Sequence, residues 1–289
     1  MGGAITANSL ERLVRAEEGT SSPVPSRGAL SDRTHTGLGE DARPFVVSKG
    51  YGPVGGLAGY RRPYWDTQPP YLYPPYASTV TRSPTQPLVL IPQTLSEVTG
   101  PVFGQGDVEE GDNDLTHRFA GEPLGERIVV SGRVMDANGR PVPQTLVEIW
   151  QANACGRYRH ERDAHDAPLD PNFDGCGRTL TDREGRYQFL TVKPGPYPWR
   201  NHHNAWRPAH IHFSLFGPSF VTRLVTQMYF PGDPLLPYDP IFNSTANEVA
   251  RARLVSALDF ERTTPEYALG FRFDIVLRGR SETPLEGDR

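Results

Sequence analysis

Short stretches of alternating apolar and polar residues recur along most of the chain after its first third. Because successive side chains of a β-strand point to opposite faces, such alternation is typical of strands that lie between a core and solvent. The pattern predicts strands at residues 88–91, 127–135, 145–150, 187–192, 209–216, 222–230 and 271–277. The dipeptide Asn138-Gly139, directly after the second of these, is a hairpin signal.

Only one stretch, residues 244–258, has the periodicity of a helix. It begins with Ser and Thr, which can cap a helix, and it carries apolar residues at a spacing of four, namely Ala250, Leu254 and Leu258. Several short strands joined by turns rich in Gly and Pro, with one short helix, predict an all-β protein with a β-sandwich core and long loops.

The first part of the chain has a different character. Residues 1 to about 45 are polar and aperiodic, and residues 50–76 combine tyrosine and tryptophan with many prolines. Proline excludes regular helix and sheet, and aromatic side chains at this density need a surface to cover them. We therefore expect residues 1–85 to form an extended N-terminal arm, partly disordered or wrapped on a partner subunit, and residues 86–289 to form the sandwich domain.

Composition narrows the class of protein. The 289 residues carry a net charge of −4 with both signs mixed, which gives no reason to expect a nucleic acid or a membrane surface as partner. The sequence has no run of 18 apolar residues, and its first residues lack the apolar core of a secretory signal. Cys155 and Cys176 form neither a CxxC motif nor a disulfide framework. We expect a cytoplasmic protein with reduced cysteines.

The candidate chemistry is concentrated in residues 197–212, which read YPWRNHHNAWRPAHIH. His210 and His212 are two residues apart in a predicted strand, so both imidazoles should point to the same face, as a pair of metal ligands would. Arg207 is close by in the sequence. Taken singly, however, histidines in this arrangement more often have a structural role.

Two long and irregular connections, residues 151–181 and 193–208, offer further candidates, because loops of this length in a compact domain are usually functional. The first contains Tyr158, and the second contains Tyr197 between two prolines. Two phenolates and two imidazoles would form a hard oxygen and nitrogen ligand set. Such a set favours Fe(III), whereas an all-His or Cys-rich set would favour zinc or copper.

A family resemblance is carried by five ordered segments, which read LVEIWQANACGRYRH, APLDPNFDGCGRTLTDREGRY, KPGPYPWRNHHNAWRPAHIHFSLFGPS, TQMYFPGDPL and FRFDIVLRG. They closely resemble the intradiol ring-cleavage dioxygenases, and within that family the iron-bearing β subunits that act on protocatechuate. The resemblance runs from about Tyr76 to Arg280. Residues 1 to about 70 depart from it, and we infer no function for them.

The resemblance implies one non-haem Fe(III) per chain. The implied iron ligands are Tyr158, Tyr197, His210 and His212. The implied catalytic residues are Arg207, Tyr197 and Gln227. The implied residues that line or back the substrate pocket are Trp150, Trp199, Ile241 and Tyr76. Histidines that match no functional residue of the family, and that we expect at the surface, are His160, His165, His202 and His203.

The implied reaction is the cleavage of protocatechuate by O2 between its two hydroxyl-bearing carbons, to give 3-carboxy-cis,cis-muconate in the β-ketoadipate pathway of aromatic catabolism. An α-type subunit would complete a hetero-oligomer. Two alternatives stay open: an intradiol dioxygenase for another catechol, such as catechol or hydroxyquinol, and a non-catalytic sandwich subunit. A non-catalytic subunit should have lost at least one ligand, and here all four are present.

Overall fold

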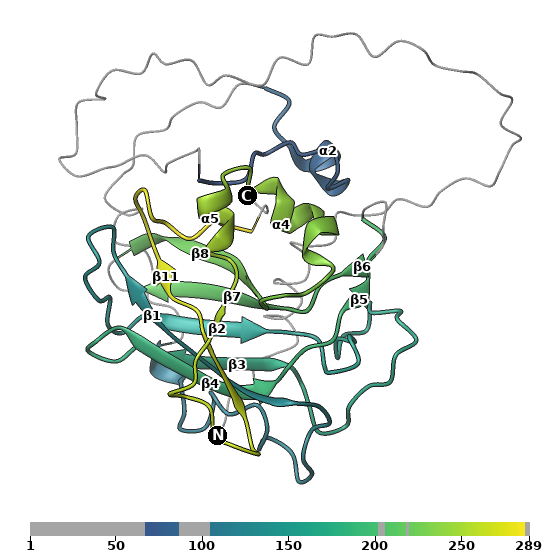
Figure 1. Cartoon of the computed structure of the whole chain (residues 1–289), viewed down its shortest axis with the longest axis vertical. Coiled ribbons are helices and arrows are strands. Elements are labelled where there is room, and N and C mark those ends of the chain that lie inside the picture. Colours follow the sequence, from purple (N-terminus) through teal and green to yellow (C-terminus); the bar gives the residue numbers. More distant parts are fainter. Residues whose placement is uncertain (1–66, 87–104, 202–205, 218–219, 287–289) are drawn as a thin grey trace, which may run out of the picture. The chain divides into compact units, whose positions relative to one another are not determined.

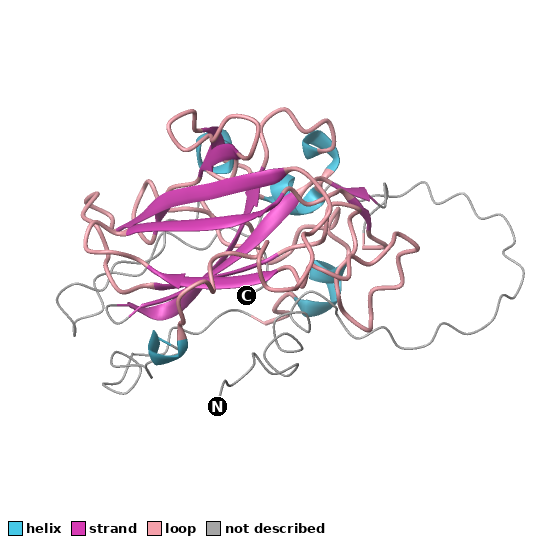
Figure 2. Cartoon of the chain, turned by 90° about the horizontal axis from the view of Figure 1, so that it is seen from below, coloured by secondary structure: helices cyan, strands magenta, loops and turns pink. Residues whose placement is uncertain are grey.

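Two β-sheets packed face to face form the protein in its computed structural model, which describes residues 67–86, 105–201, 206–217 and 220–286. The two layers of strands are seen almost edge-on in Figure 2. A single cluster of buried apolar side chains, drawn from both sheets, fills the space between them. The expected all-β sandwich is therefore confirmed.

The first sheet is organised around its longest strand, β1 (Arg127–Met135). One edge of β1 pairs antiparallel with β4 (Arg186–Val192), and the other pairs in parallel first with β10 (Leu269–Arg272) and then with β11 (Ile275–Val276). The outermost strand, β9 (Ala257–Leu258), pairs with β10. Strands from both ends of the domain thus meet on β1.

The second sheet is antiparallel throughout and has the order β3 (Cys176–Leu180), β2 (Leu146–Trp150), β7 (His210–Gly217) and β8 (Phe220–Tyr229). A separate two-stranded ribbon joins β5 (Tyr197–Pro198) to β6 (Trp206–Arg207). The helical segments, several of them labelled in Figure 1, are all short: α2 (Ser78–Arg82), η1 (Gln105–Asp107), η2 (Leu236–Tyr238), α4 (Pro240–Ser244) and α5 (Glu248–Ala252).

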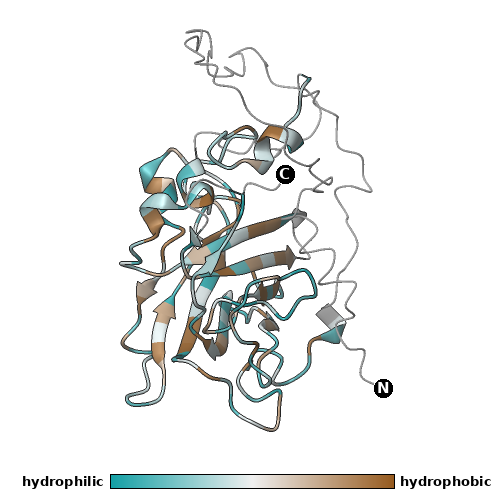
Figure 3. Ribbon diagram, turned by 90° about the vertical axis from the view of Figure 1, so that its right-hand side faces the viewer, coloured by the Kyte–Doolittle hydropathy of each residue, from teal (hydrophilic) through white to brown (hydrophobic). Residues whose placement is uncertain are grey.

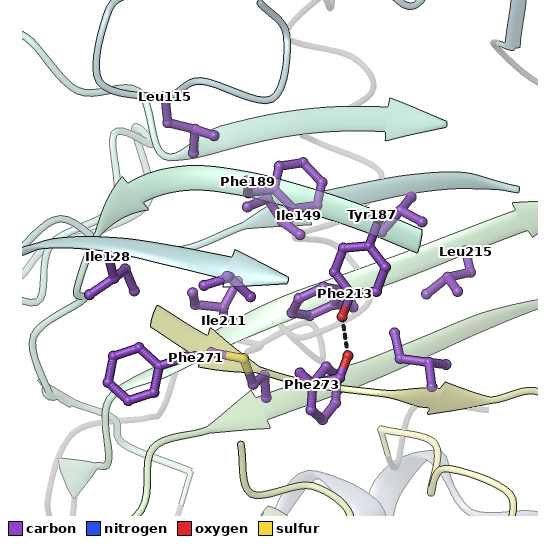
Figure 4. Packing of buried hydrophobic residues seen from close by; sticks show 14 of the residues in the cluster. Leu115, Ile128, Ile149, Tyr187, Phe189, Ile211, Phe213, Leu215, Phe271 and Phe273 are labelled. Carbon is purple, nitrogen blue, oxygen red and sulfur yellow. Dashed lines mark hydrogen bonds between the residues drawn. The ribbon is translucent and has the colours of Figure 1, made fainter. Parts of the chain in front are cut away.

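Side chains along β7 point alternately into the core and to the opposite face of the sheet, where the two strand histidines lie. Ile211, Phe213 and Leu215 belong to the core cluster, so the residues between them face the opposite side of the sheet. The Phe213 ring lies 5.1 Å from that of Phe273 in the other layer, as Figure 4 shows. Bands of apolar and polar residues alternate along the strands in Figure 3. His210 and His212 therefore share the outer face of the second sheet.

Most of the predicted strands are confirmed within two residues. These are 127–135, 145–150, 187–192, 209–216 and 222–230. The strand predicted at 88–91 lies outside the described residues.

The strand predicted at 271–277 is interrupted between β10 and β11. At the interruption the carboxylate of Asp274, rather than a backbone carbonyl, accepts a hydrogen bond from the Arg133 N–H at 3.0 Å. An irregular step of this kind breaks one ladder into two short ones.

The prediction of one helix at 244–258 is wrong. Ser244 ends α4, and Asn247 begins α5 by accepting a hydrogen bond from the Ala250 N–H at 3.0 Å. Beyond α5 the backbone turns to the open edge of β8, where the Leu254 carbonyl accepts a hydrogen bond from Tyr229 at 2.8 Å. Unpaired backbone N–H and C=O groups on the edge of a strand can bond to a passing chain. Here the chain beyond α5 bonds to the edge of β8 instead of continuing the helix.

Two other expectations about local structure need correction. The connection 151–181 is not wholly irregular, because it contains β3, whose five residues are too few to show clear alternation. Asn138-Gly139 does form a turn, with Gly139 at φ +76°, but only the bridge between Met135 and Pro141 follows it. The chain then crosses to the other sheet instead of completing a long hairpin.

The described part of the N-terminal arm, residues 67–86, packs against the domain. The Thr67 hydroxyl donates to Glu282 Oε1 at 2.9 Å, and the Leu285 N–H donates to Gln68 Oε1 at 2.7 Å. Whether the preceding residues are extended stays a prediction, because residues 1–66 are outside the described ranges. Both cysteines are free, as expected. No helix among the described residues is long and apolar enough to cross a bilayer.

Candidate active site

The two strand histidines converge through their Nε2 atoms, which lie 3.2 Å apart. Nδ1 of His210 is 2.7 Å from the Pro208 carbonyl, and Nδ1 of His212 is 3.1 Å from Glu286 Oε2. Since a carbonyl and a carboxylate can only accept, each Nδ1 carries the hydrogen. A ring with its hydrogen on Nδ1 can offer Nε2 as a lone pair to a metal, and the two Nε2 atoms are directed to the same place.

Both imidazoles are buried, with exposures of 2% for His210 and 0% for His212. Burial, followed by the charges of Arg207 and His212, lowers the pKa of His210 well below its ordinary value, so this ring is neutral. The Trp150 ring stacks on His212 at 4.7 Å with an interplanar angle of 5°. Two lone pairs so close together are the arrangement expected of two ligands about 2.1 Å from one metal ion.

Two phenols approach the histidine pair from the long loops. The hydroxyl of Tyr197 is 3.5 Å from His210 Nε2. The Tyr158 ring meets Tyr197 edge-on at 5.4 Å and lies 6.5 Å from the His212 ring. The structure thus brings all four residues together from the strands β7 and β5 and one loop. Among the described residues no group of three or more His, Cys, Asp or Glu side chains is arranged to hold a metal. The oxygen and nitrogen donors fit Fe(III).

The loop that carries Tyr158 is shaped by Asn153, which is buried. Its side-chain oxygen accepts hydrogen bonds from the N–H groups of Cys155 at 2.9 Å and Arg157 at 3.0 Å. Gly156 then passes close to the second loop, where a Cβ would lie 2.0 Å from the Pro196 carbonyl oxygen. Its φ of +78° is also one that side chains disfavour. The absence of a side chain at Gly156 lets the two tyrosine loops meet.

Gly156→Ala is expected to push the two tyrosine loops apart and to lower the free energy of unfolding by about 2–4 kcal/mol, from left-handed backbone strain plus overpacking. Gly139→Ala is the matched control, because Gly139 has a φ of +76° but nothing within 4 Å of a Cβ. That control should lose only about 1–2 kcal/mol. Chemical denaturation together with iron content measures both effects. Equal losses in the two variants, with iron retained, would contradict the role given to Gly156.

Among the residues that the structure describes, Arg207 is the largest fully buried side chain, with an exposure of 1%. Its NH1 group is 3.0 Å from His210 Nε2 and 3.3 Å from the Tyr197 hydroxyl. Its NH2 group donates to Gln227 Oε1 at 2.5 Å and to Asp239 Oδ2 at 3.0 Å. Because Arg is always charged in proteins, these acceptors hold a permanent positive charge beside the candidate metal position.

Asp239 and Tyr229 belong to this network, and the sequence did not indicate them. Asp239 is fully buried, and its other oxygen accepts from the Ile241 N–H at 2.8 Å, so it caps α4. The Asp-Pro dipeptide that opens the helix was the available signal. Burial, then the charge of Asp239, raises the pKa of Tyr229 well above its ordinary value. Tyr229 therefore stays protonated and donates to Gln227 Oε1 at 2.8 Å.

The other expected pocket residues surround this network. Trp199 lies between the arm and the arginine, with its ring 5.3 Å from Tyr76 and 5.2 Å from the Arg207 guanidinium. Tyr76 is fully buried, and Ile241 is buried in α4 beside Asp239. Of the histidines expected at the surface, His160 and His165 are partly exposed, and His202 and His203 lie outside the described residues.

Comparison with known proteins agrees with this geometry. A family model described as "Dioxygenase" matches residues 98–279, and one described as "Protocatechuate 3,4-dioxygenase beta subunit N terminal" matches residues 60–94. The protocatechuate 3,4-dioxygenase beta chain of Burkholderia cepacia is 60% identical over 224 residues, which are 77% of this chain and 95% of that one. The corresponding alpha chain of Pseudomonas putida is 31% identical and covers 68% of this chain and 97% of its own length.

Among solved structures, 3-chlorocatechol 1,2-dioxygenase from Rhodococcus opacus is 27% identical, with a TM-score of 0.42 over 56% of this chain and 63% of that one. The chain belongs to the intradiol dioxygenase family, whose members use non-haem iron. Within that family it belongs with the protocatechuate 3,4-dioxygenase beta chains, which have an alpha chain counterpart.

Proposed function

We propose that this chain is the iron-bearing β subunit of a protocatechuate 3,4-dioxygenase, which uses O2 to cleave protocatechuate between its two hydroxyl-bearing carbons to 3-carboxy-cis,cis-muconate. The observation that carries the proposal is the convergence of two imidazoles and two phenols beside a buried arginine. The 60% identity to a beta chain of that enzyme supports the choice of substrate.

One Fe(III) per chain would be held by Tyr158, Tyr197, His210 and His212. Bound there, the iron would supply a Lewis acid that activates a catechol toward O2. Two phenolates neutralise much of the ionic charge and so favour the trivalent state.

The residues of the chain prepare the substrate. A catechol must lose the protons of both hydroxyl groups to chelate a metal. The Tyr197 oxygen, next to His210, is placed to take up one of them if it is held as a phenolate, and the other would pass to a hydroxide ion in the site. Arg207 is fixed by Gln227 and Asp239 before substrate arrives, so its charge can stabilise negative charge that develops on the ring without reorganisation. Trp150 covers His212 and Trp199 covers the Arg207 guanidinium with apolar surface.

An α-type chain is the partner that we propose for the hetero-oligomer. It would also complete the pocket around the substrate carboxylate. The mixed surface charge and the two free cysteines support a cytoplasmic location.

The proposal is tested by the visible absorption spectrum of the protein co-expressed with its α-type partner. We expect a tyrosinate-to-Fe(III) charge-transfer band that shifts when protocatechuate is added without O2. A colourless protein that carries zinc or no metal would refute the iron chemistry and favour a non-catalytic subunit. A band that ignores protocatechuate but responds to catechol or hydroxyquinol would keep the chemistry and change the substrate.

A further inference from the structure

We propose that Glu286, near the C-terminus, is a positioning residue for His212: its carboxylate fixes the imidazole ring and makes it a stronger donor to the iron. The inference rests on the proposed iron site and adds a residue that neither the sequence pattern nor the ligand set indicated. It also gives the C-terminal segment a role in metal binding.

The contact itself is well shielded from water. Glu286 Oε2 lies 3.1 Å from His212 Nδ1, and the two side chains are 2% and 0% exposed. A carboxylate that accepts the Nδ1 hydrogen holds the ring in the tautomer that leaves Nε2 for a metal, and it raises the basicity of that nitrogen. In a buried place this effect is not screened by solvent.

Hydrogen bonds hold the C-terminal segment against β8 and so define the position of Glu286. After β11 the chain returns to the edge of β8, where the Glu286 N–H donates to the Val225 carbonyl at 2.8 Å. The Thr226 hydroxyl donates to the Pro284 carbonyl at 2.7 Å. The arm holds the same segment through Gln68, as described above. The stretch from β11 to Glu286 is drawn in yellow in Figure 1. Three hydrogen bonds to the backbone of residues 284–286 thus hold the carboxylate of Glu286 next to the imidazole of His212.

The two histidines are therefore not equivalent as donors. His210 directs its Nδ1 hydrogen to a neutral carbonyl, whereas His212 directs it to a carboxylate. A negative charge one ring away from the metal favours the trivalent over the divalent ion. Burial lowers the pKa of Arg223, and the charges of Glu148 and then Glu286 act against that shift, so Arg223 attracts the Glu286 carboxylate and reduces the cost of burying it. We infer that Glu286 helps to keep the iron bound and oxidised.

Glu286→Gln tests the inference, because it keeps the size of the side chain and removes its charge. The matched control is Glu282→Gln, in the same segment: Glu282 is equally buried, but it accepts from Thr67 and not from His212. In the enzyme with its α-type partner, Glu286→Gln should release iron to a chelator about 10–100-fold faster than wild type. Its Fe(III)/Fe(II) reduction potential should rise. Glu282→Gln should stay within about twofold of wild type.

Unfolding of the iron-free proteins completes the design, because it reports the docking of the C-terminal segment without the metal. Comparable stability of the two iron-free variants, with iron loss and a raised potential only in Glu286→Gln, supports the proposal. Wild-type behaviour of Glu286→Gln would overturn it, as would equal iron loss in both variants. If the wild-type protein itself binds no iron, the proposed function fails, and this inference fails with it.

Discussion

His210→Ala is expected to abolish stoichiometric iron binding and to lower turnover of protocatechuate by about a thousandfold or more. The metal supplies several kcal/mol of charge stabilisation in reactions of this kind, and each 1.36 kcal/mol corresponds to about a factor of ten in rate. The substitution also removes the imidazole nitrogen that lies 3.0 Å from Arg207 NH1 and 3.2 Å from the second histidine. The substitution should therefore weaken iron binding and also disturb the hydrogen bonds that orient Arg207.

Iron content per chain and the tyrosinate charge-transfer band measure the first effect, and steady-state turnover measures the second. His117→Ala serves as control, since His117 is exposed and pairs at the surface with Asp114 at 2.7 Å. That variant should keep its iron, its band and its activity. A His210→Ala protein that retained stoichiometric iron with an unchanged band would show that His210 is not a ligand.

The candidate site could be predicted from the sequence where the geometry is local. His210 and His212 share a face because a strand repeats every two residues, and the structure places their Nε2 atoms together. The approach of Tyr158 to Tyr197 has no such basis, because it depends on two loops that meet at Gly156. Only the family resemblance indicated that approach.

Residues that act through long-range contacts could not be predicted in this way. Glu286 reaches His212 across 74 positions of sequence, and Asp239 reaches Arg207 across 32. The sequence around Glu286 does not indicate that its carboxylate contacts a buried imidazole. The sequence around Asp239 likewise does not indicate that its carboxylate contacts a buried guanidinium. The failed helix at 244–258 has a related cause: Ala250 and Leu254 are buried as the pattern predicted, but Leu258 is exposed, because the backbone beyond α5 pairs with the edge of β8 instead of continuing the helix.

The strand β7 contributes one face to the core and the other face to the candidate site. The inner face of β7 packs Phe213 against the other sheet, and its outer face holds two imidazoles at a fixed separation. A close-packed core has low compressibility, so the strand is a rigid support for the two histidines. Of the two phenols, Tyr158 comes from a loop and Tyr197 from the two-residue strand β5, which pairs only with β6. The phenols therefore lack the support that the larger sheet gives to the two histidines.

Asp239→Asn is expected to lower the free energy of unfolding by about 3–5 kcal/mol, because it leaves the charge of Arg207 buried without its carboxylate partner. Both side chains of the pair are almost completely buried, at 1% and 0% exposed, with a separation of 3.0 Å. Asparagine caps helices as well as aspartate does, so the start of α4 is preserved and the charge is the quantity changed. Turnover should fall too, since Arg207 would lose one of the groups that orient it.

The double variant Arg207→Met/Asp239→Asn separates stability from catalysis. Removing the unpaired charge should recover much of the lost stability, because apolar replacements of buried ion pairs are often neutral, while turnover should stay at the low level set by the missing guanidinium. Chemical denaturation of the wild type, both single variants and the double variant gives the coupling energy directly. If the two single losses simply add in the double variant, the pair is not coupled. Asp239 would then act on α4 alone and not through the arginine.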